Sequence, residues 1–406
     1  MIRVNNIHLS LDYDDKSVRK AVAQQLRIEE KSIKSCKIFR RSVDARKKDN
    51  IYFLTTVDAE LNINEEKVCK KCGNAQIARK YEYNQMKFGN APSPVIVGAG
   101  PAGLFAALIL ARSGAKPILI ERGRDVDRRT ADVNRFWTSG QLDATSNVQF
   151  GEGGAGTFSD GKLNSGTKDI RQRKVLEEFV SHGAPDEILY NAKPHIGTDM
   201  LKGTIKNIRN EIIELGGMVM FETKLVSMDF CDNKLKAITV ETANGDEIIE
   251  TSNVILAIGH SARDTFEMLY DLKLPIEAKP FSVGARIEHL RQKVDKAQYG
   301  RFAGDKKLGS ANYKLSTHLD NGRGVYTFCM CPGGKVVNAS SEENRLCTNG
   351  MSEFARDAEN SNSALLVGIN PDDYESDHPL AGMYLQRKLE SKAFVAGGEN
   401  YNAPIQ

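Results

Sequence analysis

The chain has 406 residues and a formal net charge of +3, and its composition is 40% hydrophobic and 27% charged. The length predicts two or three globular domains, and the small net charge excludes a protein whose whole surface binds polyanions. The cysteines are odd in number, 7, which does not fit the disulfide framework of a secreted protein. The first residues lack the apolar core of a signal peptide, and no apolar run approaches the ~18 residues that span a bilayer. We therefore expect a cytoplasmic protein without a membrane span.

Residues 1–66 have the pattern of a small α/β domain. Alternating apolar side chains predict a strand over residues 2–9, the aspartates at 14–15 are placed to cap a helix, and the run 51–57 predicts another strand. A basic run, residues 40–48, lies between them and could contact nucleic acid or an acidic partner. Because no aromatic or glycine pattern accompanies it, we favour a solvated loop and expect no nucleic-acid partner.

The next segment, residues 67–94, is polar and predicts a linker. It contains Cys69 and Cys72, whose C-x-x-C spacing is typical of a redox pair or of half a zinc site. No second pair with matching spacing is present, and no thioredoxin-like pattern surrounds these two residues. We therefore favour two surface thiols and expect no metal site.

The stretch 95–123 predicts a strand, a glycine turn, a helix and a second strand. Directly after the first apolar run, Gly98, Gly100 and Gly103 form the pattern G-x-G-x-x-G. The first glycine permits a tight turn, the second lets a pyrophosphate approach the backbone, and the third lets the helix pack closely on the strand. Pro101 suits the first helical turn, where its missing N–H has no helical partner to lose.

Glu121 stands at the end of the second strand, about twenty residues beyond the glycine turn, as in dinucleotide-binding folds. An acid at this place can accept both ribose hydroxyls of an adenosine. The helix N-terminus offers N–H groups and partial positive charge to a pyrophosphate. The order of strand, turn, helix, strand and acid predicts a dinucleotide site, but it does not distinguish FAD from NAD.

A second glycine-rich stretch occupies residues 148–163. Its glycines, within residues 151–161, are too dense for the interior of a helix or strand. Phe150, Phe158 and Leu163 give the stretch apolar anchors that a free linker would not need. We therefore predict a loop whose backbone approaches a ligand.

The remaining sequence alternates helices and strands and then becomes mostly β. Helices are predicted at 170–180, 204–215 and 264–270, hairpin strands at 234–242 and 247–251, and a buried strand at 253–260. From about residue 275 the pattern predicts strands at 281–288, 313–316, 325–331 and 335–339, with a last helix at 384–396. The predicted fold is α/β, with a Rossmann-like domain (95–270) that contains a central hairpin and an inserted, mostly β substrate domain (271–406).

Several of these segments carry a family resemblance. Residues 95–123, the strand end Ala257-Ile-Gly259 and the later β region resemble glutathione-reductase-type flavoproteins, in which the chain passes the FAD again at that strand end. More narrowly, the glycine-rich loop and the segments 279–286, 327–334 and 349–352 resemble the family of uncharacterised FAD-dependent dehydrogenases. The resemblance covers about the whole chain, including the small N-terminal domain.

The resemblance implies an FAD cofactor and the residues that hold it. The pyrophosphate is implied at residues 98–103, the ribose at Glu121 and Arg122, the adenine at Val226 and the flavin near residues 153–157. By residue, the implied set is Gly98, Ala99, Gly100, Pro101, Ala102, Gly103, Glu121, Arg122, Gly153, Gly154, Ala155, Gly156, Thr157, Val226, Ala257 and Gly259. Such flavoproteins also have a third FAD segment, an apolar strand followed by Gly-Asp or Gly-Glu. Nothing after Val336 matches it, so we expect a truncated chain whose FAD pocket is open on one side.

The function predicted is an FAD-dependent oxidoreductase that transfers hydride through the flavin to or from a small molecule. There is no second G-x-G-x-x-G with a following acid, so NAD(P)H, if it is the donor, has to dock over the flavin. Catalytic residues are not determined. Alternation places Cys329 and Cys331 on one face of a strand, where core packing is the commoner role and a disulfide needs a bend. His260 could be a general acid, although helix capping or a structural hydrogen bond is the commoner role for such a histidine. Lys162 and Arg286 could bind an anion or a flavin carbonyl, but a salt bridge is equally consistent with the pattern.

A competing hypothesis is a flavin- or nucleotide-binding redox sensor, or an RNA-associated regulatory protein, that uses the basic N-terminal domain as its contact surface. The sequence does not indicate the oligomeric state.

Overall fold

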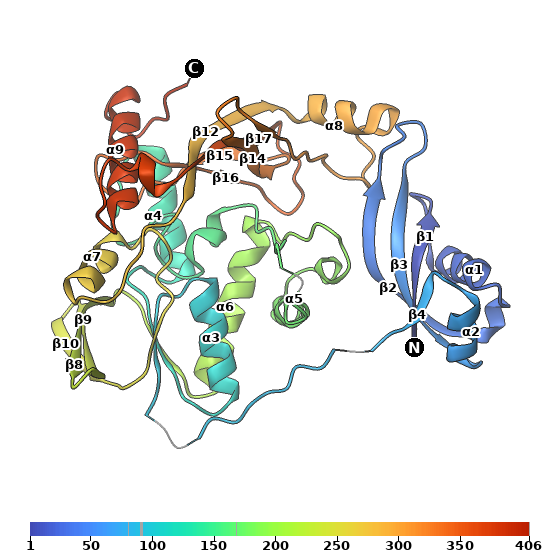
Figure 1. Ribbon diagram of the computed structural model, residues 1–406, viewed down its shortest axis with the longest axis horizontal. Coiled ribbons are helices and arrows are strands. Elements are labelled where there is room, and N and C mark those ends of the chain that lie inside the picture. The colour runs from blue at the N-terminus through green and yellow to red at the C-terminus, as the bar shows by residue number, and fades with distance from the viewer. Residues whose placement is uncertain (80, 90–91, 168, 406) are drawn as a thin grey trace.

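The computed structural model describes residues 1–79, 81–89, 92–167 and 169–405. In Figure 1 the N-terminal domain (blue) stands on one side of the molecule, and the chain then runs along the lower edge to the central sheet. The C-terminal strands and α9 lie above that sheet and its helices. Lys80, Asn90 and Ala91, in the predicted linker, and Gln406, in the predicted truncated end, lie outside the described residues.

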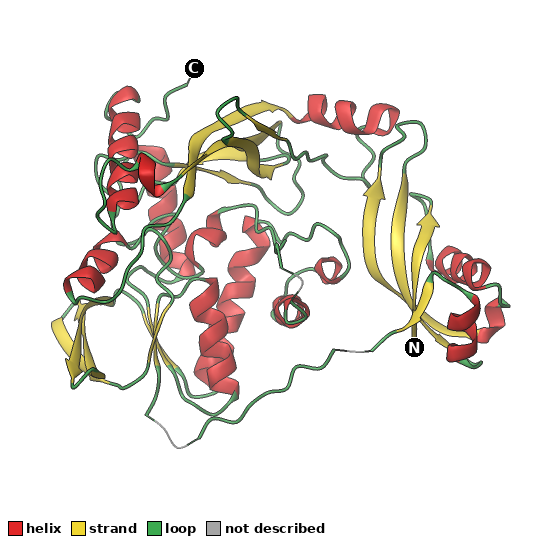
Figure 2. Cartoon of the chain, in the orientation of Figure 1, coloured by secondary structure: helices red, strands yellow, loops and turns green. Residues whose placement is uncertain are grey.

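The N-terminal domain is an antiparallel sheet covered by two helices, as Figure 2 shows. Its elements are β1 (Ile2–Leu9), α1 (Asp15–Leu26), η1 (Glu30–Ser32), β2 (Ile33–Asp44), β3 (Tyr52–Leu61), α2 (Glu65–Lys71) and β4 (Ala75–Ile77), with the strand order β2-β3-β1-β4. The first strand and helix are confirmed, and the Asp14 side chain caps α1 by accepting from the Ser17 N–H. A bulge between Val4 and Ile7 keeps both of these side chains in the core.

Three features of this domain differ from the sequence prediction. The run 40–48 is not wholly a loop, because β2 pairs with β3 as far as Asp44. Within the run, Arg41 binds the Asn191 side chain and Arg46 pairs with Asp44, so two of its cations have partners in the chain. The thiols of the C-x-x-C pair are half-buried against the domain core rather than on the surface. The sheet also continues past residue 66, because β4 pairs with β1.

The central domain contains a parallel sheet of order β11-β5-β6-β7 and an antiparallel sheet of order β10-β9-β8. The strands are β5 (Val95–Val97), β6 (Ile118–Ile120), β7 (Met218–Met220), β8 (Lys224–Cys231), β9 (Lys234–Thr242), β10 (Gly245–Glu250) and β11 (Val254–Leu256). The helices are α3 (Pro101–Arg112), α4 (Val126–Ser139), η2 (Gly154–Phe158), α5 (Gln172–Ser181), η3 (Asp186–Leu189), α6 (Thr198–Glu214) and α7 (Arg263–Asp271). The apolar faces of α3 and α6 share one core with the parallel sheet. The predicted strand–turn–helix–strand unit and central hairpin are confirmed.

The C-terminal part is built on a sheet of order β12-β17-β14-β13 with a hairpin of β15 and β16 beside it. Its elements are β12 (Phe281–Leu290), α8 (Arg291–Tyr299), η4 (Gly300–Phe302), β13 (Ser316–His318), β14 (Gly324–Cys331), β15 (Lys335–Asn338), β16 (Thr348–Met351), β17 (Asn360–Ile369), η5 (Pro371–Asp373) and α9 (Ala381–Ala396). The predicted strand at 313–316 is wrong, since β13 begins only at Ser316. The sequence analysis also missed β17, whose first half, Asn360-Ser-Asn-Ser, has low β-propensity.

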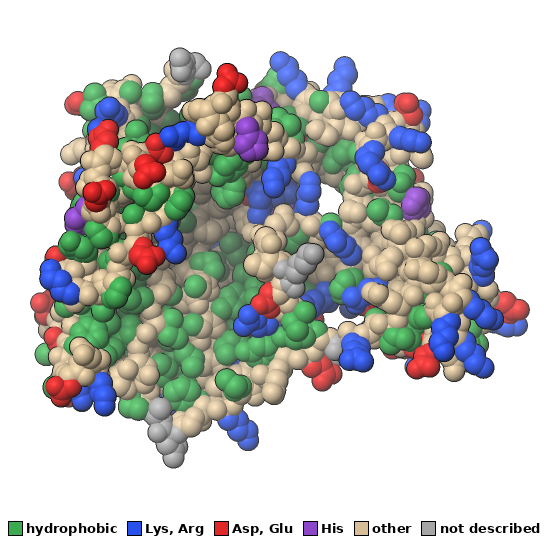
Figure 3. All heavy atoms as spheres, viewed as in Figure 1, with side chains coloured by type: hydrophobic (Ala, Val, Ile, Leu, Met, Phe, Trp, Pro, Cys, Tyr) green, Lys and Arg blue, Asp and Glu red, His purple; other side chains and the backbone are tan. Residues whose placement is uncertain are grey.

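Surface chemistry differs between the domains. In Figure 3, hydrophobic side chains spread over the region of β8, β9, β10 and the central sheet, whereas Lys and Arg side chains are frequent over the N-terminal domain and α8. Within the ranges that the structure describes, no helix combines the length and the apolar composition that crossing a bilayer requires.

Candidate functional site

A cavity of about 590 Å³ opens where β5, β6 and β11 end at their carboxyl termini. This is the edge of a parallel sheet at which α/β folds place their ligands, and the volume is within the usual range for small-molecule sites. Eleven of the implied FAD residues line it, namely Gly98, Gly100, Pro101, Ala102, Glu121, Arg122, Gly154, Ala155, Gly156, Ala257 and Gly259. The structure therefore brings three separated segments of the chain to one cavity.

Each of the three glycines of the first turn is required for a different physical reason. Gly98 has φ +102°, and a Cβ there would lie 2.5 Å from the Ala257 carbonyl oxygen. A Cβ at Gly103 would collide with the Gly98 carbonyl oxygen, so its absence allows α3 to pack on the strand. A Cβ at Gly100 would meet only the Gly154 Cα, at 3.9 Å, and would occupy the cavity instead. Only the middle glycine leaves its space to a ligand.

The N-terminus of α3 points into the same cavity and has no capping side chain among the described residues. Gly100 is the N-cap residue, Pro101 follows at the first helical position, and the first turn has no acidic residue. The first N–H groups of a helix lack intrahelical partners, and the helix dipole favours an anion there. This end of α3 can therefore accept a phosphate group.

Glu121 is buried at the end of β6, and backbone N–H groups hold its carboxylate. Oε2 accepts from Ala99 at 2.8 Å, and Oε1 accepts from Gly123 at 2.9 Å and from Gly151 at 3.0 Å. A carboxylate offers about four acceptor sites, so roughly one remains for a ligand. Glu121 thus ties both glycine segments together, and it has less capacity for ribose hydroxyls than the sequence analysis assumed.

The second glycine loop lies directly over the first turn. The Gly153 N–H donates to the Ala99 carbonyl oxygen at 2.8 Å, and a Cβ at Gly154 would lie 3.1 Å from the Gly100 Cα. Arg129 of α4 is fully buried and donates to five backbone carbonyl oxygens of this loop. These oxygens belong to Asn147, Val148, Gly151, Glu152 and Gly154.

Burial lowers the pKa of Arg129 to about 10, despite the opposing charges of Glu121 and Glu152. The guanidinium has only five N–H donors, so the loop uses its full capacity. The loop is therefore a folded structure around Arg129. No sequence motif singles out this residue.

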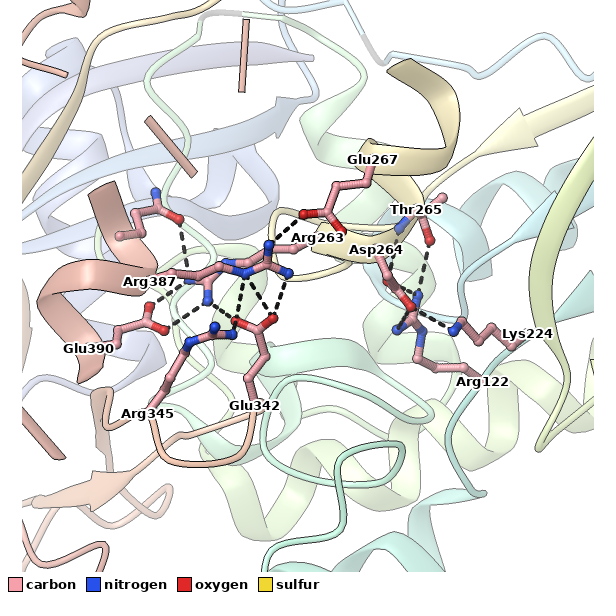
Figure 4. Close-up of polar contacts among 11 residues, drawn as sticks. Arg122, Lys224, Arg263, Asp264, Thr265, Glu267, Glu342, Arg345, Arg387 and Glu390 are labelled. Atoms are coloured by element: carbon pink, nitrogen blue, oxygen red, sulfur yellow. Dashed lines mark hydrogen bonds and ion pairs between the residues drawn. The ribbon is translucent and has the colours of Figure 1, made fainter. Parts of the chain in front are cut away.

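Arg122 forms part of the cavity wall, and its guanidinium is not free to bind a ribose as the sequence analysis expected. Its guanidinium donates to the Asp264 carboxylate at 2.9 Å and to the Thr265 hydroxyl at 3.0 Å, and it lies over the Phe150 ring at 4.4 Å. Lys224 pairs with the same Asp264 carboxylate at 2.8 Å (Figure 4). Burial raises the pKa of Asp264, but the hydrogen bonds and charges of Arg122 and Lys224 outweigh it and hold this pKa at about 2. This network fixes α7 beside the cavity.

A second ion-pair network joins α7 to the C-terminal part, as Figure 4 shows. Arg263 pairs with Glu390 of α9 at 2.6 Å and also contacts Glu342. Arg387 of α9 pairs with Glu342 at 2.8 Å and with Glu267 of α7 at 2.5 Å. The network attaches α9 to the helix that bounds the cavity.

The structure does not place all the implied residues at the cavity surface. Ala99, Gly103, Gly153, Thr157 and Val226 are absent from its lining within the described residues. Val226 lies inside β8, and its neighbours Thr223, Lys224 and Leu225 line the cavity instead. Side chains from α7 and from the start of the second glycine-rich stretch also line it, and the sequence analysis did not assign them to the site: Gln149, Phe150, Thr265, Phe266 and Leu269.

Of the candidate catalytic residues, only His260 lies at this cavity, where it is exposed and contacts the Ser261 hydroxyl at 3.4 Å. Cys329 and Cys331 both lie beside Lys162, as two residues on one face of a strand would, but the strand is not regular there, because β14 carries a bulge between Phe328 and Cys331. Lys162 and Arg286 lie beside these cysteines instead of at the cavity lining.

Comparisons with known proteins agree with the geometry. Residues 93–132 match the family model "FAD binding domain", residues 280–406 match "FAD-dependent protein, C-terminal domain-like", and residues 1–60 match a domain of unknown function. An uncharacterised protein of Clostridium beijerinckii is 48% identical over 411 residues, which cover 100% of this chain and 76% of that protein. The chain belongs to the same family as this clostridial protein. FAD is the cofactor that the two descriptive family models indicate for it.

Solved flavoproteins show only distant likeness. The flavin-dependent brominase Bmp2 has 13% identity and a TM-score of 0.37, with 77% of this chain and 62% of that chain covered. The flavin-dependent halogenase CmlS has 15% identity and a TM-score of 0.37, with 77% and 46% covered. A flavoprotein/dehydrogenase of Cytophaga hutchinsonii has 12% identity and a TM-score of 0.33, with 74% and 62% covered. The chain thus spans less than two thirds of these structures, and TM-scores this low add nothing to the family assignment.

The cavity residues fit an FAD. The position of Gly100 leaves a cradle that a Cβ would fill, and the uncapped end of α3 supplies N–H groups for a pyrophosphate. The apolar lining, with Phe150, Leu225, Phe266 and Leu269, suits aromatic rings.

Proposed function

We propose that this protein is an FAD-dependent oxidoreductase acting on a small molecule. The observation that carries the proposal is the convergence of both glycine segments and the end of β11 on one cavity at the open N-terminus of α3. The N–H groups of the first turn of α3 would hold the pyrophosphate. The remaining acceptor site of Glu121 would hold one ribose hydroxyl, and the segment 223–225 would hold the adenine, in place of Val226.

Bound FAD would supply two-electron, hydride-type redox chemistry, and the protein would bind, orient and shield the reacting groups. The Gly154–Gly156 backbone and His260 would border the flavin side of the cavity. The β-rich C-terminal part, fixed to α7 by the Arg263 network, would hold the substrate. NAD(P)H as electron donor would dock over the flavin. These assignments rest on the cavity lining and on the family models.

The first experiment is titration of the purified protein with FAD, followed by fluorescence quenching and by co-elution in gel filtration. We expect a stoichiometric yellow complex. Anaerobic mixing of this complex with NADH or NADPH should then bleach the visible flavin band, and the faster of the two identifies the donor. Absence of FAD binding would contradict the cofactor assignment. Binding without bleaching by either nucleotide would contradict only the choice of donor.

A flavin-binding redox sensor or an RNA-associated regulator remains the competing hypothesis. Arg41 of the basic run argues against it, because its guanidinium already binds the Asn191 side chain. Salt-dependent binding of RNA by the full-length protein would support it.

A further inference from the structure

Two thiols and two cations meet where the end of the second glycine loop contacts the C-terminal sheet. The Lys162 ammonium lies 3.5 Å from the Cys331 sulfur and 3.9 Å from the Cys329 sulfur. Arg286 of β12 donates to the Cys329 carbonyl oxygen at 2.8 Å and lies 3.9 Å from the Cys331 sulfur. Both cysteines are free thiols, and neither they nor the two cations line the cavity assigned to FAD.

The backbone of β14 is distorted at these cysteines, and both sulfurs lie beside the Lys162 ammonium. Phe328 pairs with Ala364 and Cys331 pairs with Asn362, so two residues of β14 oppose the single Ser363 of β17. Cys329 has φ +45°, which is uncommon for a residue with a side chain. Bulges re-aim side chains and are frequent beside active sites.

The residues around Cys329 and Cys331 fix the position of this cluster. Asp160 is completely buried, pairs with Lys162 at 2.9 Å and accepts from Arg356 at 2.9 Å, so it fixes the ammonium beside the sulfurs. Gly350 of β16 provides the space, because a Cβ there would lie 2.7 Å from the Cys331 sulfur and would collide with Arg286. Four separate segments therefore contribute to one cluster.

The two thiols have different exposure and different acidity. Cys329 is half-exposed, whereas Cys331 is fully buried. A hydrogen bond from the Cys331 thiol, with the charges of Lys162 and Arg286, lowers the pKa of Cys329 against the effects of burial and of Asp160. The same hydrogen bond and burial raise the pKa of Cys331. Reactive cysteines occupy such electropositive and partly exposed places, whereas structural ones are buried and inert.

We propose that Cys329 and Cys331 form a dithiol–disulfide redox centre that reacts with external disulfides, with Cys329 as the attacking and Cys331 as the resolving residue. The Cys329 thiolate attacks one sulfur of the substrate, the substrate S–S bond breaks, and half of the substrate leaves as a thiolate. Cys331 then gives its proton to that thiolate and attacks the Cys329 sulfur, which releases the second half as a thiolate and closes the Cys329–Cys331 disulfide. The substrate gains two electrons and the protein dithiol loses two. This activity is independent of the flavin chemistry proposed above.

The first test measures alkylation of each cysteine by iodoacetamide as a function of pH, with peptide mass spectrometry as the readout. An unperturbed thiol reaches half its maximal rate near pH 8.5. We expect the Cys329 profile to have its midpoint below about pH 7, because Cys331, Lys162 and Arg286 favour the thiolate more than Asp160 opposes it. Lys162→Met should move this midpoint upward by about one unit or more. A midpoint near that of an unperturbed thiol, or one that Lys162→Met leaves in place, would overturn the proposal.

The second test uses oxidised glutathione with the full-length protein. The wild type should release two equivalents of glutathione and close the Cys329–Cys331 disulfide. Cys331→Ser should stop at a glutathione adduct on Cys329, whereas Cys329→Ser should form no adduct on the buried Cys331. Cys231→Ser, at an exposed thiol far from the cluster in sequence, is the matched control and should behave as wild type. Circular dichroism establishes that each variant is folded. Absence of the Cys329 adduct in a folded Cys331→Ser protein would refute the mechanism.

Discussion

Substitution of Gly100 by alanine separates ligand binding from folding at the glycine turn. The residue has φ −71°, which alanine adopts readily, and the nearest atom to the new Cβ is the Gly154 Cα at 3.9 Å. Alanine reduces the backbone freedom of the unfolded chain, which stabilises the folded protein by about 0.4–1 kcal/mol. Alanine is also a poor N-cap residue, and this effect lowers the folding stability by a comparable amount. The free energy of unfolding of the FAD-free protein should therefore change by less than about 1 kcal/mol.

The same methyl group would project into the cavity at the end of α3, where we place the pyrophosphate. We expect the Kd for FAD to rise at least about tenfold, which corresponds to about 1.4 kcal/mol. The assay is fluorescence titration with FAD, paired with thermal unfolding of the FAD-free protein.

Gly98→Ala is the contrasting variant, because φ +102° and a Cβ 2.5 Å from the Ala257 carbonyl oxygen predict a loss of at least about 1–3 kcal/mol in folding stability. Gly73→Ala, with nothing near its Cβ, should change neither quantity. Wild-type FAD affinity in a folded Gly100→Ala protein would refute the assignment of the pyrophosphate to this turn.

Three further outcomes follow from buried charges. In Arg129→Lys, the lysine cannot supply the five N–H donors of the guanidinium, so the folding stability should fall by about 3–5 kcal/mol and FAD should bind more weakly. Thermal unfolding measures the stability, and an unchanged melting temperature would contradict the role of Arg129 in the loop. Glu121→Gln turns an N–H group toward backbone N–H donors and should cost about 1–3 kcal/mol by chemical denaturation, with Gly73→Ala again as the neutral comparison. Burial raises the pKa of Glu342, but Arg387 and Arg263 outweigh it and hold this pKa at about 2, so roughly 3 kcal/mol of stability is present above about pH 4.5 and is lost as the pH falls toward 2. Glu342→Gln should flatten that acid dependence in unfolding curves recorded across this range.

The local parts of the fold were predictable because each depends on residues close together in sequence. The strand–turn–helix unit at 95–112 follows from an apolar run, glycines at fixed spacing and a proline at the first helical position. The hairpin of β9 and β10 follows from its Asn-Gly turn. In contrast, β17 carries serine and asparagine in its first half and is stabilised by its neighbours β12 and β14, which pair with it from distant parts of the chain. Tertiary pairing there overrides weak local propensity.

The candidate site was likewise predictable only where a feature depends on residues close together in the sequence. The glycine pattern predicted which backbone borders the cavity, since that role depends on the absence of a Cβ at Gly100. It could not show that Arg129 holds the second loop, because the five carbonyl oxygens are satisfied only after α4 folds against that loop. Nor could alternation show that Lys162 lies beside Cys329 and Cys331, because that lysine belongs to the second glycine loop, in a distant part of the chain. From the sequence alone, such residues are interpreted as core packing or as solvated charges. Only the tertiary structure shows which groups they contact.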